Sequence, residues 1–210
     1  MGRWSLYAIA IAFAINAIPA RGEAILEIGT VMAGQGSSGN TIGVDVENSG
    51  GTNLIIGGFN FEIVGDSAID FTGADFPTSP PYIFAGDSFD QVNSLPLNTT
   101  TGVSLLASDI SNSGNGDTLG AGQTAGLALV TFDVSPTAPL GPVTIAFSID
   151  PSDTNLSDPN GDSIAIDTFV SGTIDVTAAV PEPSAAAMLA VALLGVGAHA
   201  MRRASRKPGS

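Results

Sequence analysis

The chain has 210 residues, a formal net charge of −14 and no cysteine. No Lys, Arg or His lies between residues 25 and 180, whereas all 20 acidic residues except Glu23 and Glu182 lie within that stretch. This composition excludes disulfides, thiolate metal sites and catalytic groups that need Cys, His or Lys, and an acidic surface repels nucleic acid and anionic lipid.

The N-terminal segment has the pattern of a signal peptide. Arg3 precedes an apolar run over residues 6–18 that only Asn16 interrupts, and small residues follow the run. The run is too short to span a membrane comfortably, so we predict a cleaved signal helix within residues 1–24. Cleavage after residue 20, 22 or 24 is open, since a small residue precedes each of these bonds.

Residues 25–178 show the period-two alternation of half-buried strands and no helical stripe. The predicted strands cover residues 25–31, 42–47, 59–64, 128–134, 143–149 and 170–176. Clusters of turn-forming residues separate them at 34–40, 48–53, 111–116, 136–142 and 150–162. Short strands joined by turns predict one all-β domain, an antiparallel β-sandwich with a single core.

The C-terminal segment, residues 179–207, joins a proline-rich motif, an apolar run and a basic cluster. Residues 185–201 are almost entirely Ala, Leu, Val, Gly and Met, with an interruption at His199. As a helix this run reaches about 25 Å, just under the thickness of a hydrocarbon core. We therefore predict a single transmembrane helix, with the domain outside and the basic C-terminus on the cytoplasmic side.

The residues that define this segment are Val180, Pro181, Glu182, Pro183, Ser184, Arg202 and Arg203. In this order they resemble the PEP-CTERM sorting signal. The resemblance implies processing at Pro-Glu-Pro by an exosortase, a membrane cysteine transpeptidase, in a Gram-negative bacterium that makes extracellular polysaccharide. It further implies an inner-membrane anchor before processing and a location at the cell surface or outside the cell afterwards.

Three stretches of the domain carry a second likeness. Residues 53–63 contain a Gly-aromatic-x-aromatic strand, residues 126–141 contain a pair of late strands, and residues 156–176 contain a last hairpin and strand. Together they resemble the cohesin-like branch of the carbohydrate-binding-module sandwich family, which implies a jelly-roll type β-sandwich. After Ile63 this chain has Val64, Gly65 and Asp66 where that family has a Tyr-Asp-Pro corner, and dockerin binding is only what the family name suggests.

Two sets of residues are candidate ligand contacts. Hard oxygen ligands suited to Ca²⁺ crowd one loop: Asp150, Asp153, Asn155, Asp158, Asn160 and Asp162. Their spacing is not that of an EF-hand, and the same residue types also form plain turns because their side chains cap their own backbone. Tyr82, the single Tyr between residues 25 and 180, is a candidate carbohydrate contact, with the alternative that it covers the edge of the core.

These patterns together predict a non-enzymatic exported surface or matrix protein with no cofactor other than the candidate Ca²⁺. Its expected partners are the exosortase, extracellular polysaccharide or another surface protein, and the membrane through the C-terminal helix. One alternative is a carbohydrate-binding module for polysaccharide binding or breakdown. The other is a secreted glycosidase that uses two carboxylates, although nothing in the sequence selects a pair.

Overall fold

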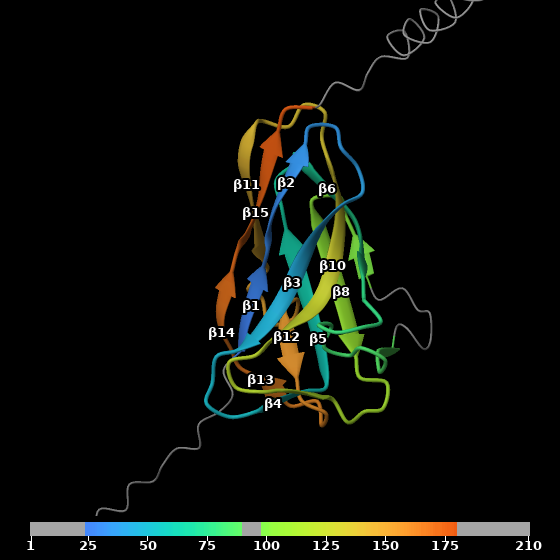
Figure 1. The fold of residues 1–210 in the computed structure, drawn as a ribbon, viewed down its shortest axis with the longest axis vertical. Coiled ribbons are helices and arrows are strands. Elements are labelled where there is room, and N and C mark those ends of the chain that lie inside the picture. Colours follow the sequence, from blue (N-terminus) through green and yellow to red (C-terminus); the bar gives the residue numbers. More distant parts are fainter. Residues whose placement is uncertain (1–23, 90–97, 180–210) are drawn as a thin grey trace, which may run out of the picture.

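Two β-sheets packed face to face form the part of the chain that the structure describes (Figure 1). The computed structural model describes residues 24–89 and 98–179. The predicted signal helix, the transmembrane helix and the sorting residues at 180–184, 202 and 203 lie outside these residues and stay predictions. Within the described ranges, no helix has the length and apolar character needed to cross a membrane.

The first sheet has five strands in the order β14-β1-β3-β10-β6. Their bounds are Ile166–Val170, Ala24–Ile28, Asn40–Asn48, Thr124–Val134 and Ile69–Asp75. The second sheet runs β13-β12-β5-β11-β15-β2, and β8 and then β7 extend it from the other side of β5. Their bounds are Ser163–Ile164, Asn155–Ser157, Gly58–Val64, Gly141–Phe147, Gly172–Thr177, Thr30–Gly34, Ser104–Ile110 and Asn98–Thr100. A separate two-stranded ladder joins β4, Leu54–Ile56, to β9, Asp117–Leu119.

The first predicted strand is two strands, because the chain passes from one sheet to the other at Gly29. β1 pairs with β3 and β14, whereas β2 pairs with β15 in the second sheet. The backbone of Gly172 on β15 packs closely against this crossing. A Cβ on Gly172 would lie only 2.5 Å from the Gly29 carbonyl oxygen, so no larger residue fits there without a shift. The pairs β1/β14 and β15/β2 are parallel, which corrects the expectation of a wholly antiparallel sandwich.

Alternate residues of the facing strands fill the space between the sheets, as the period-two pattern predicted. On β5, Phe59, Phe61 and Ile63 are buried. The Phe61 ring meets the edge of Phe147 with centroids 6.3 Å apart, and Phe59 stacks on Phe84 at 5.8 Å. Aromatic pairs of this kind contribute about 0.5–1.5 kcal/mol beyond the area they bury. The core therefore depends on apolar packing centred on β5.

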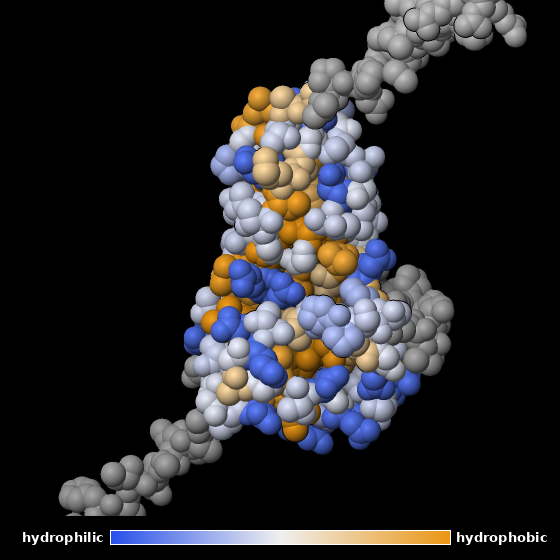
Figure 2. Space-filling view, viewed as in Figure 1, coloured by the Kyte–Doolittle hydropathy of each residue, from blue (hydrophilic) through white to orange (hydrophobic). Residues whose placement is uncertain are grey.

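Acidic side chains gather on the outer face of the first sheet, which carries Glu27, Asp45, Glu47, Asp70, Asp75 and Asp133 at outward positions of β1, β3, β6 and β10. Figure 2 shows hydrophilic residues around the middle and lower parts of the sandwich. Glu27 stands directly opposite Asp45, and Asp133 directly opposite Asp70. Burial, and secondarily the facing Glu27, raise the pKa of Asp45 above its ordinary value. Like charges placed opposite each other destabilise a sheet.

The first prediction is that salt stabilises this domain. Because no basic side chain lies between residues 25 and 180, interactions among its side-chain charges are repulsive, at about a few tenths of a kcal/mol for neighbours some 10 Å apart. Raising NaCl from about 10 to 500 mM shortens the Debye length well below 10 Å. We expect the melting temperature of residues 24–179 to rise by about 2–4 °C for each kcal/mol of repulsion relieved.

The control is Glu27→Gln, which removes the charge that faces Asp45 and should show a smaller salt effect. Mild acidification should also raise the melting temperature, through protonation of Asp45. A raised folded-state pKa means that the folded chain holds this proton more tightly than the unfolded chain does. A melting temperature that stays flat or falls with salt would show that the acids are too far apart to interact.

Candidate functional site

The outer face of β11, β5 and β8 carries exposed apolar side chains on the central strands of the second sheet. Val64 and Leu106 are each 41% exposed, and Ile110 is 49% exposed. Val64 pairs with Ala146 on one side and with Ser104 on the other, and Leu106 lies one outward position further along β8. Val64, Leu106 and Ala146 thus form one apolar group that extends over three strands, with Ile110 further along β8.

The rest of this face is polar but almost uncharged. The other outward residues of the three strands are Asn60, Glu62, Ser104, Ser108, Pro142 and Thr144. Glu62 is the one ionisable side chain among them, in contrast to the acidic outer face of the first sheet. Binding surfaces for proteins combine such an apolar centre with neutral hydrogen-bonding groups and few charges. We call the outward side chains of β11, β5 and β8 the neutral face.

Buried side chains beneath the neutral face hold its strands in place. Phe61, Leu105 and Ile145 point inward from the same three strands and have no exposed surface. Asp109 is the inward residue before Ile110, and its carboxylate accepts hydrogen bonds from the buried Tyr82 hydroxyl and from the Ile110 N–H. Because the strands are fixed from below, the neutral face is preorganised for binding.

Tyr82 lies in the core, where the structure gives its ring no open face for a sugar. Its side chain is 3% exposed, and the ring packs against Phe76 at 6.0 Å and edge-on against Phe84 at 6.2 Å. The hydroxyl donates to Asp109, which provides the partner that a buried Tyr requires. Tyr82 thus occupies a core position, and a carbohydrate contact at this residue stays a prediction.

The candidate calcium residues lie in two separate turns, except Asn155, which begins β12. Asp150, Asp153 and Asn155 follow β11, and the Asp150 carboxylate accepts hydrogen bonds from the Ser152 N–H at 2.9 Å and the Ser152 hydroxyl at 2.8 Å. These bonds lower the pKa of Asp150. Asp153 accepts a hydrogen bond from the Ser148 hydroxyl at 3.1 Å. The Asn155 amide, at the start of β12, donates to the Pro151 carbonyl of this turn at 3.0 Å.

The second turn connects β12 to β13 and contains Asp158, Asn160 and Asp162. The Asp158 carboxylate accepts the N–H groups of Asn160 at 2.8 Å and Asp162 at 2.9 Å, and these bonds, the one from Asp162 most, lower its pKa. Gly161 has a φ of 85°, which favours glycine. Among the residues that the structure describes, no three acidic, His or Cys side chains are grouped to hold a metal. Calcium binding here stays a prediction.

Sequence reasoning missed β8, which supplies Leu106 and Ile110. The segment Ser104–Ile110 contains two adjacent leucines, so one of them must point outward, and its third inward position is Asp109. An acid at an inward position hides the apolar alternation. The adjacent leucines between turn-forming residues are the signal that would have identified a strand with one apolar residue on its solvent face.

The second prediction separates a turn from a metal site at Asp158. If the carboxylate only caps the turn, Asp158→Ala lowers the melting temperature equally with EDTA and with Ca²⁺, and Asp158→Asn, which keeps one acceptor oxygen, retains most of the stability. Because the folded-state pKa of Asp158 is lowered, this contribution is present at neutral pH and is lost as the pH falls below the ordinary Asp value of about 3.9.

A bound ion would behave differently. Ca²⁺ at a hundredfold excess over its dissociation constant stabilises the native state by about 2.7 kcal/mol. A drop in the melting temperature of the unmodified chain on adding EDTA, abolished by combining Asp158→Ala with Asp162→Ala, would establish the ion and contradict the turn interpretation.

No protein-family model and no curated protein matches this chain. Solved structures do: a cohesin of Clostridium acetobutylicum has a TM-score of 0.55 at 20% identity, over 79% of this chain and 94% of that one. A cohesin–dockerin complex from Clostridium thermocellum gives 0.52 at 14% identity, over 74% and 99%. A non-cellulosomal cohesin from the archaeon Archaeoglobus fulgidus gives 0.51 at 15%, over 74% and 91%. The domain therefore has a cohesin-like β-sandwich fold, as the resemblance in sequence implied.

Proposed function

We propose that this chain is a non-enzymatic exported protein of the cell surface or extracellular matrix, whose sandwich binds another protein through the neutral face. The observation that carries the proposal is the exposure of Val64, Leu106 and Ile110 on a nearly uncharged surface of an otherwise strongly acidic domain. Apolar groups that share a face with neutral donors and acceptors suit a folded protein partner better than they suit solvent.

The fold supports a binding function of this general kind. One of the similar solved structures is a complex of a cohesin with a dockerin, so a sandwich of this architecture takes a protein partner in that case. For this chain we propose a protein partner with an apolar contact surface of its own. The acidic outer face of the first sheet would repel other acidic molecules and so favour approach through the neutral face.

The third prediction uses the absence of cysteine from the natural sequence, which makes any introduced thiol unique. A photoreactive maleimide on Thr144→Cys, an outward position of β11, should cross-link one discrete protein from the extracellular fraction of the producing cells. The same reagent on Thr41→Cys, which is exposed on the first sheet, should not. Adding Leu106→Glu to Thr144→Cys should remove the cross-link, because the partner would have to bury a charge.

Leu129→Glu is the matched control. Leu129 is 41% exposed, like Leu106, but it lies on the outer face of the first sheet. It should leave the cross-link from Thr144→Cys unchanged. Loss of the cross-link with both Glu variants, or equal labelling from Thr41→Cys, would contradict a specific protein contact at the neutral face.

We further propose that the tail from residue 180 onward carries the domain to its destination through exosortase processing at Pro181-Glu182-Pro183, and that the product associates with extracellular polysaccharide. The order of the Pro-Glu-Pro motif, the apolar run and the basic cluster in the sequence supports this proposal. β1 begins in the lower half of the sandwich and β15 ends at its upper end (Figure 1), so residue 179 lies far from residue 24.

The fourth prediction follows the tail with two epitope tags. A tag after Ser210 should occur transiently in the inner-membrane fraction, whereas a tag in the exposed turn at Gly51 should reach the cell surface or the medium. Replacing Pro181 and Pro183 with Ala should keep both tags in the membrane. Pro139→Ala, a control in the loop between β10 and β11, should process normally. A full-length chain that stays in the inner membrane of a host with a working exosortase would contradict processing.

A further inference from the structure

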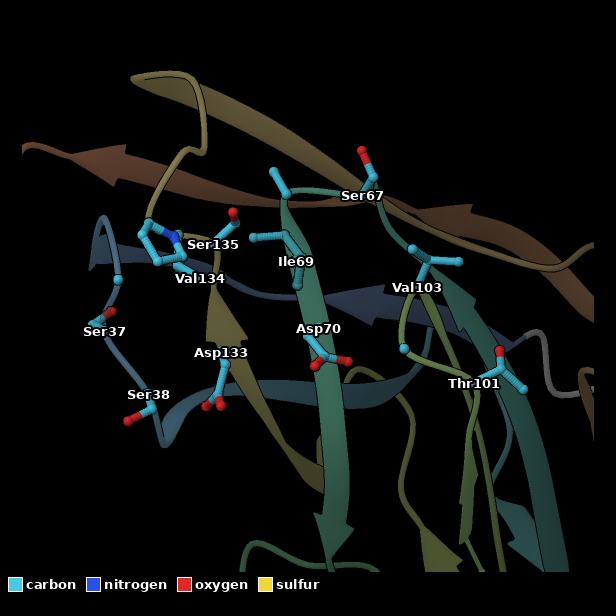
Figure 3. Close-up of a pocket in the computed structure, with 14 residues that line it drawn as sticks. Ser37, Ser38, Ser67, Ile69, Asp70, Thr101, Val103, Asp133, Val134 and Ser135 are labelled. Atoms are coloured by element: carbon cyan, nitrogen blue, oxygen red, sulfur yellow. The ribbon is translucent and has the colours of Figure 1, made fainter.

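A cleft of about 540 Å³ lies at the end of the sandwich where β6 begins and β10 ends (Figure 3). Four segments line it: residues 36–38 before β3, 67–70 at the start of β6, 101–103 before β8, and 133–136 at the end of β10. Its volume lies within the range of about 300–1,000 Å³ that is typical of pockets for small ligands. The cleft adjoins the neutral face at one wall, where the Thr101 hydroxyl lies 2.7 Å from the Ser104 hydroxyl, but Asp70 and Asp133 belong to the first sheet.

Backbone hydrogen bonds between the four segments form the cleft without a ligand. The Val134 N–H donates to the Ser37 carbonyl at 2.9 Å, and the Ser135 N–H donates to the Ala68 carbonyl at 2.9 Å. On the other side, the Phe71 N–H donates to the Gly102 carbonyl at 2.7 Å. A ligand would therefore bind without first ordering these loops, which removes one cost of binding.

The lining combines hydroxyl groups with two carboxylates. Ser37, Ser38, Ser67, Thr101 and Ser135 contribute hydroxyls, and Val103 and Pro136 contribute small apolar surfaces. Figure 3 shows Asp70 and Asp133 on neighbouring strands, with Ser37 and Ser38 to one side and Thr101 to the other. Such a lining offers many hydrogen-bond acceptors and donors on a scale that suits a polyhydroxylated ligand.

The two carboxylates belong to directly opposite residues of neighbouring strands. Asp70 and Asp133 are cross-strand partners in the β6/β10 ladder. Asp133 accepts one hydrogen bond, from the Gly39 N–H at 2.8 Å. Gly102, with a φ of 80°, turns the chain beside Asp70, and a Cβ there would lie 3.3 Å from the Asp70 Oδ1. Since no basic residue lies between residues 25 and 180, no side chain of the domain relieves this repulsion.

We infer that this cleft binds a saccharide unit bearing a free amino group, as part of the proposed association with extracellular polysaccharide, on which the inference rests. The ammonium group lies between Asp70 and Asp133 and neutralises their repulsion. The ring hydroxyls meet the Ser and Thr side chains of the walls. An acidic sugar is repelled by the same carboxylates, and an acetylated amine loses the charge that the pair attracts.

The experiment measures binding by calorimetry on the full chain in a polyoxyethylene detergent, which has no sugar headgroup to compete. The probes are a β-1,4-linked glucosamine disaccharide, its di-N-acetylated form and the methylamide of N-acetyl-lysine. A pH near 6 keeps the carboxylates ionised and the amines protonated. We expect the glucosamine disaccharide to bind at least tenfold more tightly than either of the other probes, because only it offers both the ammonium and the ring hydroxyls.

Two isosteric variants and a matched control locate the site. Asp70→Asn and Asp133→Asn should each weaken binding of the glucosamine disaccharide at least tenfold, while Asp75→Asn, on the same strand as Asp70 but outside the cleft, should change it less than twofold. Absence of binding, equal binding of the acetylated sugar, or an equal effect of Asp75→Asn would overturn the inference. Equal binding of the lysine derivative would do so too, by showing a site for any amine.

Failure of the saccharide-binding inference can be distinguished from failure of the protein-binding proposal. Leu106→Glu alters the neutral face and should leave saccharide binding intact, and Asp70→Asn should leave the cross-link from Thr144→Cys intact. If the glucosamine disaccharide fails to bind while the cross-link persists, only the cleft inference is wrong.

Discussion

The absence of any basic side chain between residues 25 and 180 is the constraint on which the rest of this structure depends. No ion pair can form among those residues, so their carboxylates need other partners. Many accept backbone N–H groups in turns and at strand ends, as Asp66, Asp87, Asp109, Asp117, Asp133, Asp150 and Asp158 do. Hydrogen bonds of this charge-assisted kind are stronger than those between neutral groups. The acids thereby fasten loops instead of pairing with bases.

The same constraint separates the two outer faces of the sandwich. Acids that do not cap the backbone stand mainly on the first sheet, where Glu27 faces Asp45 and solvent screens the repulsion only in part. In the second sheet, β11, β5 and β8 carry a single outward acid, Glu62, beside exposed Val64 and Leu106, and the neighbouring strand β15 carries Asp175. A protein that approaches the domain therefore meets one surface that repels acidic molecules and one that is neutral and partly apolar. The asymmetry comes from charge placement, since both sheets are built on the same alternation.

Much of the fold could be predicted from the sequence, because β3, β5, β10, β11 and β15 alternate clearly between buried and exposed residues. The prediction failed for segments whose secondary structure is determined by tertiary contacts. β12, Asn155–Ser157, lies within a stretch expected to be a turn, and it is a strand because it pairs with β5 beside the end of β11. Local turn chemistry does not show such pairing partners.

The candidate sites were harder to predict than the fold. Asp158 and its neighbours suggested a metal because carboxylates, amides and glycine serve both ions and turns. In the structure the Asp158 carboxylate accepts backbone N–H groups of its own turn. Tyr82 suggested a sugar contact because it is the one Tyr of the domain, but only the packing shows its ring inside the core. Asp70 and Asp133 are 63 residues apart in the chain, and only the register of β6 against β10 brings them together.

The two parallel strand pairs at the chain ends have a mechanical consequence. β1 starts in the lower half of the sandwich in Figure 1 and β15 finishes at its upper end, and β2, which continues β1, runs parallel to β15. A pull that arrives through both chain ends would slide β2 and β15 past each other, so that all the hydrogen bonds between them bear the load together. Antiparallel terminal strands pulled from the same end would instead peel apart one bond at a time. Resistance to such a pull is set by the rate of unfolding, not by equilibrium stability. Parallel pairing of β2 with β15 thus distributes the load of such a pull over all of their hydrogen bonds at once.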